Sequence, residues 1–255
     1  MVIKYTMMNK LCLLFHRYTY KRTPGNLKNE FIMESTVYRE DQLRFNHPFT
    51  MILAGGRRTG KTFFTKKLLE HNRERISLPP LDTIVWFFGA PQQDVFNEVQ
   101  QKKFEQHVKF VHGLPQDKTV QEFVTELPGQ RKLIVLDDLM EKASNRADVA
   151  ALFTHGRHEN MSVIFLTQNF FHKSKYARDI SLNIDYVVLF KNTRDPSMVM
   201  HLGQQMGNAK FLKLAYRAAT ENPFSHLFID MRSDTPEALR YRSNVLDETQ
   251  MVYRP

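Results

Sequence analysis

The sequence predicts an α/β fold with a mainly parallel sheet that helices cover on both faces. Three observations indicate it: short runs that are almost wholly apolar, polar residues or glycine at the end of each run, and helix-length segments between the runs. Strands that are buried on both faces give such continuous apolar runs, and ligands bind at the carboxyl ends of these strands. A chain of 255 residues with 42% hydrophobic residues is long enough for one such domain with extensions.

The candidate strands follow one another in a regular order. The five runs cover residues 49–54, 83–88, 132–136, 162–167 and 186–190. Apolar residues that group on one helical face predict a helix over 61–72, shortly after the first run. The later runs are also separated by segments of helix length, so the order predicts repeated strand and helix units in a layered α/β domain.

The two ends of the chain differ from this central part. We expect an N-terminal extension over 1–44, one domain over 45–235 and a C-terminal tail over 236–255. Residues 1–32 hold six basic side chains and one acidic one, so they carry more than half of the net charge of +9. We expect these residues to be flexible or to lie outside the native product. The remaining domain is only mildly basic, which permits nucleic-acid binding without requiring it.

Cysteine content and hydropathy indicate which cellular compartments fit the sequence. Cys12 is the single cysteine, so we expect no internal disulfide, and a reducing compartment fits. The apolar run beside it is too short for a secretory leader, and no run reaches the ~18 residues that a membrane span needs. We therefore expect a protein that is neither secreted nor inserted in a membrane.

A phosphate-binding loop lies between the first candidate strand and the helix, and it matches the pattern G-x-x-x-x-G-K-[ST]. Its residues are Gly55, Gly56, Arg57, Arg58, Thr59, Gly60, Lys61 and Thr62. The glycines allow a tight backbone path that points N–H groups at a phosphate, and the helix start adds its positive dipole end. We expect Lys61 to bind the β- and γ-phosphates of ATP, Thr62 to bind Mg²⁺, and Phe63 to complete the nucleotide-binding segment.

Two carboxylates follow the third candidate strand, in the position of a Walker B segment. One carboxylate can hold Mg²⁺ while its neighbour orients and deprotonates the attacking water. We assign the metal to Asp137 and the general base to Asp138. Many motor ATPases have glutamate at the second position, so the shorter aspartate has to approach the water closely or act through another water molecule.

The fourth candidate strand ends at Gln168. A polar side chain there can sense the γ-phosphate or hold the attacking water. We predict that this strand is an additional one, inserted between the phosphate-loop strand and the Walker B strand, which small-molecule kinases and GTPases usually lack. The sequence Thr-Gln-Asn alone is a weak signal, because such residues also cap helices.

Several further blocks of sequence accompany these motifs. They are residues 47–52, 136–138, 156–158, 167–169, 189–192 and 194–195. Together they resemble the genome-packaging ATPases of the HerA/FtsK superfamily, and most closely the poxvirus-like packaging ATPases of large DNA viruses, virophages and Maverick/Polinton-type elements. The resemblance covers roughly residues 45–230.

The resemblance implies a RecA-like three-layer sandwich, Mg-ATP hydrolysis and a homo-oligomeric ring that moves double-stranded DNA into a capsid. It implies capsid proteins at a portal or vertex as further partners. It also implies a location in the cytoplasm, nucleus or virus factory of a host cell, or association with the virion.

A ring ATPase needs a cation from the neighbouring subunit to neutralise the charge that develops on the γ-phosphate. Arginine suits this role because it stays charged and binds two oxygens at once. Arg157 is our first candidate and Arg194 the second, although each can also be an ordinary solvated side chain.

Other functions fit parts of the pattern. A GTPase would need N-K-x-D where the chain has Asn192-Thr193-Arg194-Asp195, and a small-molecule kinase would need an arginine-rich lid. A scaffold that binds ATP without hydrolysing it is disfavoured by the intact catalytic motifs. The main alternative is a cellular or plasmid DNA translocase or helicase of the same superfamily, which the local motifs do not separate from a packaging motor.

Overall fold

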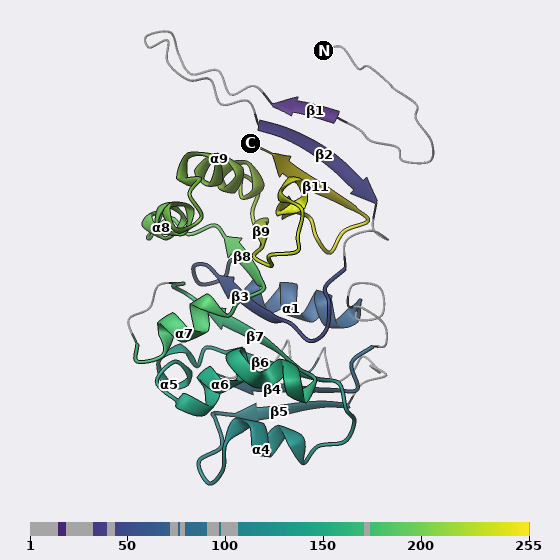
Figure 1. Cartoon of the computed structure of the whole chain (residues 1–255), viewed down its shortest axis with the longest axis vertical. Helices are drawn as coiled ribbons and strands as arrows, with labels where there is room; N and C mark the ends of the chain where they lie inside the picture. Colours follow the sequence, from purple (N-terminus) through teal and green to yellow (C-terminus); the bar gives the residue numbers. More distant parts are fainter. Residues whose placement is uncertain are drawn as a thin grey trace.

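The computed structural model describes residues 15–18, 33–39, 44–71, 76, 80–90, 97, 107–170 and 174–254. These residues form one 11-stranded sheet with helices on both faces (Figure 1). From edge to edge the strands follow the order β1-β2-β11-β10-β9-β8-β3-β7-β6-β4-β5. None of the described helices is long and apolar enough to cross a membrane.

The strands and helices have the following bounds. The strands are β1 (Phe15–Tyr18), β2 (Met33–Arg39), β3 (Thr50–Ala54), β4 (Thr83–Phe88), β5 (His107–His112), β6 (Lys132–Asp137), β7 (Met161–Thr167), β8 (Tyr186–Phe190), β9 (His226–Asp230), β10 (Tyr241–Ser243) and β11 (Thr249–Arg254). The helices are α1 (Lys61–Glu70), α4 (Val120–Thr125), α5 (Met140–Ala143), α6 (Ala147–His155), α7 (Ala177–Leu182), α8 (Ser197–Gln205) and α9 (Ala209–Ala219), with short 3-10 turns η2 (Gly156–Glu159) and η3 (Glu237–Leu239).

The six strands from β8 to β5 run parallel to one another. Strand β7 pairs with β3 on one side and with β6 on the other. The predicted fold class is therefore confirmed, including the additional strand between the phosphate-loop strand and the Walker B strand. The helices on both faces, with this sheet between them, make the three layers.

Two strands near the parallel part were not predicted. Strand β5 lies at the edge of the sheet and is only half buried, so its sequence His107–His112 contains no continuous apolar run. Strand β9 has only three apolar residues, 227–229, between His226 and Asp230, and it pairs antiparallel with β8. Both strands escaped the apolar-run criterion for these reasons.

The remaining strands extend the sheet beyond β9, and each of them pairs antiparallel with its neighbour. Strands β10 and β11 come from the residues that we predicted as a C-terminal tail, and β2 comes from the predicted extension. The sheet thus runs across both expected domain boundaries, although the division itself stays a prediction. Strand β1 pairs with β2, and the other residues of 1–32 lie outside the described part of the chain.

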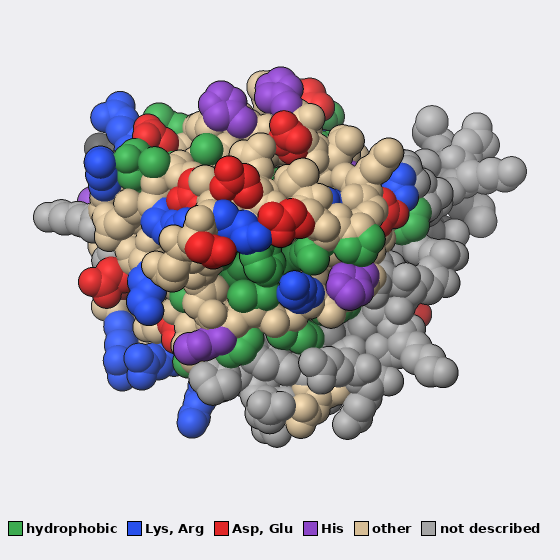
Figure 2. Space-filling model, turned by 90° about the horizontal axis from the view of Figure 1, so that it is seen from below, with side chains coloured by type: hydrophobic (Ala, Val, Ile, Leu, Met, Phe, Trp, Pro, Cys, Tyr) green, Lys and Arg blue, Asp and Glu red, His purple; other side chains and the backbone are tan. Residues whose placement is uncertain are grey.

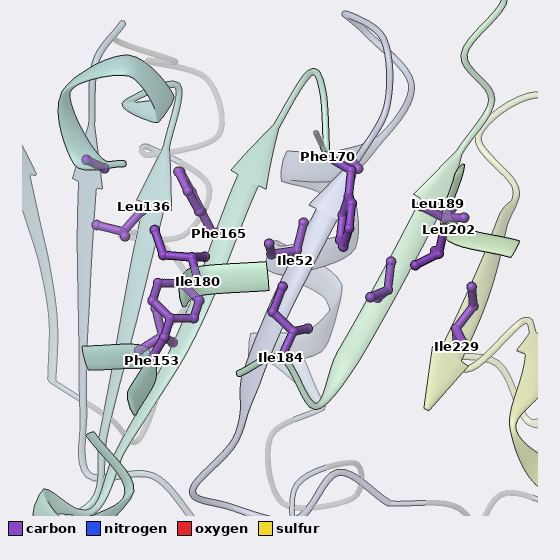
Figure 3. Close-up of a cluster of buried hydrophobic side chains, with 14 of the residues drawn as sticks. Ile52, Leu136, Phe153, Phe165, Phe170, Ile180, Ile184, Leu189, Leu202 and Ile229 are labelled. Atoms are coloured by element: carbon purple, nitrogen blue, oxygen red, sulfur yellow. The ribbon is translucent and has the colours of Figure 1, made fainter. Parts of the chain in front are cut away.

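The hydrophobic core is divided between the two faces of the sheet. On one face, Ile52 and Ala54 of β3 join a cluster that α4, α6, α7, α8 and α9 cover (Figure 3). On the other face, Met51 and Leu53 of the same strand join a cluster to which α1 contributes Phe64, Leu68 and Leu69. Alternate residues of β3 are therefore buried on opposite faces, which explains the continuous apolar run. This double burial holds rigid the strand ends that carry the polar residues.

Candidate active site

The phosphate loop joins β3 to α1 at the carboxyl edge of the parallel strands (Figure 1). Gly55 lies against Phe190 at the end of β8, and a Cβ on residue 55 would stand 2.6 Å from the Phe190 Cβ. Gly60 precedes α1 with φ of 104°, a conformation that is open to glycine and costly for other residues. The backbone path of the loop therefore requires glycine at both outer positions of the motif.

The Lys61 side chain folds back over its own loop. Its ammonium donates to the carbonyl oxygens of Gly55 at 2.8 Å and Gly56 at 2.7 Å. Burial lowers the Lys61 pKa, while the charges of Asp137 and Asp138 raise it. This places a half-buried cation over the cradle of the loop, where a bound phosphate would compensate its desolvation.

Asp137 ends β6 with only 4% of its surface exposed. Burial raises the pKa of its carboxyl to about 6, while the nearby Trp86 indole, the Thr62 hydroxyl and the charge of Lys61 act to lower it. A buried carboxylate beside a hydroxyl suits a hard divalent cation, which would compensate the charge that burial penalises. The two residues that we assigned to Mg²⁺, Asp137 and Thr62, lie close together in the lining of one cavity and fit the metal.

Asp138 leaves the strand in a left-handed turn with φ of 54°. Its side chain is exposed, and aspartate tolerates this backbone conformation better than most residues. The turn packs the carbonyl of Asp138 against Gly89, where an added Cβ would come within 2.3 Å of that oxygen. The two consecutive carboxylates therefore differ in exposure. Asp137 is buried at the end of the strand, and Asp138 projects into the open cavity beyond it.

One cavity of about 820 Å³ at this edge brings most of the predicted residues together. Its lining residues are Arg57, Arg58, Thr59, Gly60, Lys61, Thr62, Phe63, Asp137, Asp138, Leu166, Thr167, Gln168 and Phe224. Strand order explains the convergence, because β7 lies between β3 and β6 and delivers Gln168 between the phosphate loop and the carboxylate pair. A triphosphate on the loop would thus face a metal site, a candidate base and an amide. These are the functional groups that a nucleotide-hydrolysing P-loop enzyme needs. The individual roles stay predictions.

Arg157 lies outside this cavity. It belongs to η2, which precedes β7, so it stands at the amino edge of the sheet, opposite the phosphate loop. Its guanidinium pairs with the buried carboxylate of Asp185, which also accepts hydrogen bonds from the backbone N–H and the hydroxyl of Thr50. The Arg157 side chain is 52% exposed, so it is open to a neighbouring molecule. Its action in a neighbouring site stays a prediction, and it cannot act on the nucleotide of its own chain.

Arg194 lies at the other edge, in the turn after β8. The Asn192 side chain accepts hydrogen bonds from the backbone N–H groups of Arg194 and Asp195, and the Tyr216 hydroxyl accepts one from the Asn192 N–H. The exposed Arg194 side chain is thus carried by a well-braced turn on the same edge as the phosphate loop.

Two residues of the site were missed in the sequence. Trp86, the only tryptophan, lies in β4 with its neighbour Val135 on β6, and its indole reaches Asp137. A buried tryptophan needs a partner for its N–H, so its place in an apolar run beside the Walker B strand was a usable signal. Phe224 lies in the loop before β9, and nothing in the sequence around it points to the site.

Comparisons with known proteins agree with the resemblance. Residues 92–210 match the family model described as the poxvirus A32 protein. This segment includes Asp137, Asp138, Arg157 and Gln168 and begins after the phosphate loop. The similarity to poxvirus-type packaging ATPases that the sequence motifs indicated is therefore confirmed. No curated protein sequence matches the chain.

The solved structures that match the chain include an NTPase and an ATPase. One is the genome packaging NTPase B204 from Sulfolobus turreted icosahedral virus 2, in complex with ATP-gammaS, with 14% identity and a TM-score of 0.49 over 73% of this chain and 94% of that one. The other is the cytoplasmic domain of the type VII secretion ATPase EccC from Thermomonospora curvata, with 12% identity and a TM-score of 0.47 over 80% of this chain and 25% of that one.

Proposed function

We propose that this chain is an ATP-driven motor that packages double-stranded viral DNA into a capsid. The observation that carries the proposal is the convergence of the phosphate loop, the carboxylate pair and Gln168 in one cavity, with Gln168 supplied by the inserted strand β7. The match of residues 92–210 to the poxvirus A32 family supports the packaging role that the sequence resemblance implies.

The chemistry follows from the positions of the side chains. Thr62 and Asp137 would hold Mg²⁺, which supplies positive charge to the phosphates when it is bound. The Lys61 ammonium would leave the loop carbonyls to bind the β- and γ-phosphates. Asp138 accepts the proton of the attacking water, and the Gln168 amide orients that water or senses the γ-phosphate.

The ring and the DNA are part of the same proposal. Arg157 stands on the edge opposite its own nucleotide site, so only a head-to-tail arrangement of subunits would bring it to a triphosphate, namely that of a neighbour. Closed repetition of that contact gives a ring, and double-stranded DNA would pass through it. Capsid proteins at a portal or vertex would be its further partners.

The surface around α4 and β5 does not suggest a DNA track. Figure 2 views the molecule from this side, and the face mixes Lys and Arg with Asp, Glu and His side chains. A DNA path needs a basic surface, because phosphate neutralisation dominates the affinity. The proposal therefore assigns the DNA to another face of the ring.

Turnover of ATP with and without long double-stranded DNA tests this function, together with the native mass of the assembly. We expect DNA to stimulate hydrolysis and the active species to be a ring of several chains. The Lys61→Ala variant provides the background rate. A monomer whose turnover ignores DNA would contradict the motor and would favour a kinase or a nucleotide-binding scaffold.

A further inference from the structure

Two phenylalanines stand exposed beside the phosphate loop. Phe63 is 63% exposed and Phe224 is 68% exposed. Among the described residues the third large hydrophobic side chain with such exposure is Leu182, which does not line this cavity. Large apolar side chains in solvent forgo the free energy of burial, so two of them gathered at one site suggest an occupant that covers them.

The two rings approach the start of α1 from different segments. Phe63 lies in the first turn of α1, and Phe224 lies in the loop between α9 and β9. A Cβ built on Gly60 would be 3.5 Å from the Phe224 Cβ and 3.6 Å from its Cδ1. Both phenylalanines line the main cavity and also a smaller one of about 280 Å³ beside it, so the two hollows meet at the rings.

The loop around Phe224 keeps the ring exposed to solvent, and its backbone adopts an unfavourable conformation there. Phe224 has φ of 64°, which is unfavourable for a bulky residue. The next residue braces the turn, because the Ser225 hydroxyl donates to the Asn222 carbonyl at 2.7 Å. A strained backbone that keeps an aromatic side chain out of the core is a feature of ligand-contacting positions.

The lining of the main cavity contains both polar and aromatic side chains. Asp137, Asp138 and Gln168 follow β6 and β7, whereas Phe63 and Phe224 flank the start of α1. A triphosphate on the loop with its γ-phosphate toward the carboxylates would direct its ribose and base away from them, past the start of α1. Phe63 and Phe224 flank this point, so the base would come to lie beside the two rings.

We propose that Phe63 and Phe224 form the base-binding half of the site and hold the nucleotide base by stacking. Aromatic rings stack on the π-face of any base and exclude water from it. This inference rests on the proposed nucleotide site, and it adds the residues that bind the nucleoside end.

Binding of two Mg²⁺-loaded ligands, ATP and inorganic tripolyphosphate, separates the base from the phosphates. We expect Phe224→Ala and Phe63→Ala each to weaken ATP binding by about 5- to 150-fold, the range for loss of one stacking ring, with the affinity for tripolyphosphate changed less than about twofold. Phe224→Tyr should retain ATP affinity, because it keeps the ring. Leu182→Ala is the matched control, since it removes an equally exposed apolar side chain elsewhere and should leave both affinities unchanged.

Three results would overturn the inference. The first is unchanged ATP affinity in both alanine variants with the wild-type circular dichroism spectrum. The second is an equal loss for tripolyphosphate, which would mean that the rings only support the loop. The third is a smaller native mass with unchanged ATP affinity, which would make the rings a contact between subunits. Failure of the nucleotide site itself is distinguishable, because the wild-type protein would then bind neither ligand.

Discussion

The ionised carboxylate of Asp137 should lower the free energy of unfolding when no metal is bound, because it is buried. Asp137→Asn tests this, because asparagine keeps the shape of the side chain and one polar oxygen, and removes the charge. We expect the variant to be more stable than the wild type in the absence of nucleotide and metal, and to have lost metal-dependent hydrolysis.

The magnitude follows from the pKa. Burial raises the pKa of the Asp137 carboxyl from 3.8, its ordinary value, to about 6. Because the folded state holds its proton more tightly than the unfolded state, the associated stability is fully present below pH 3.8 and is lost as the pH rises through about 6. At ~1.4 kcal/mol for each pKa unit, the ionised carboxylate costs the folded state about 3 kcal/mol at neutral pH and about half of that at pH 5.

Urea unfolding in EDTA at pH 7.5 and at pH 5 measures this difference. Asp137→Asn should exceed the wild type by about 3 kcal/mol at the higher pH and by about half as much at the lower pH. Asp138→Asn is the matched control, because it alters an exposed carboxylate in the same turn and should change the free energy of unfolding by less than about 0.5 kcal/mol. Mg-ATP at 100 times its dissociation constant should stabilise the wild type by about 2.7 kcal/mol and so close most of the gap. Equal stability of Asp137→Asn and wild type at both pH values would refute the reasoning.

Three further predictions concern hydrolysis. Lys61→Ala should nearly abolish ATP turnover, because the β- and γ-phosphate charge loses its ammonium, and a wild-type rate would remove the nucleotide-site assignment. Asp138→Asn should bind Mg-ATP with wild-type affinity in a titration and lose turnover, since the amide cannot take the proton of water; normal hydrolysis would exclude it as the base. Arg157→Ala should bind ATP and assemble normally yet hydrolyse about 10³-fold more slowly, as after loss of an arginine finger. An assembled Arg157→Ala ring with unchanged turnover would shift the role to Arg194, to be tested in the same way.

The sequence predicted the parallel half of the sheet because strands such as β3 are buried on both faces and leave apolar runs. The same physics predicted where Gln168 and Asp137 lie, since parallel strands deliver the residues after them to one edge. Edge and antiparallel strands carry weaker signals. Strand β5 is half exposed, and β10 has only three residues, so pairing rather than composition defines them.

The parts of the site that the sequence did not reveal depend on contacts between distant segments. Phe224 reaches the phosphate loop from a position 164 residues after Gly60, and no local pattern marks it. The ion pair between Arg157 and Asp185 also cannot be predicted from the local sequence, because Asp185 directly precedes β8 and lies far from Arg157 along the chain. Trp86 is the intermediate case, since its strand was predicted but its contact with Asp137 follows only from the order of β4 and β6.

Displacement of a third strand from linear double-stranded DNA tests the motor most directly. A labelled oligonucleotide is bound as a triplex at one position on a long duplex, and its release is followed after addition of Mg-ATP. We expect the assembled protein to release it in an ATP-dependent manner, with a lag that grows with the distance from the duplex end, and we expect Lys61→Ala to release none. Hydrolysis of ATP on this DNA without any displacement would contradict translocation, and with it the packaging function.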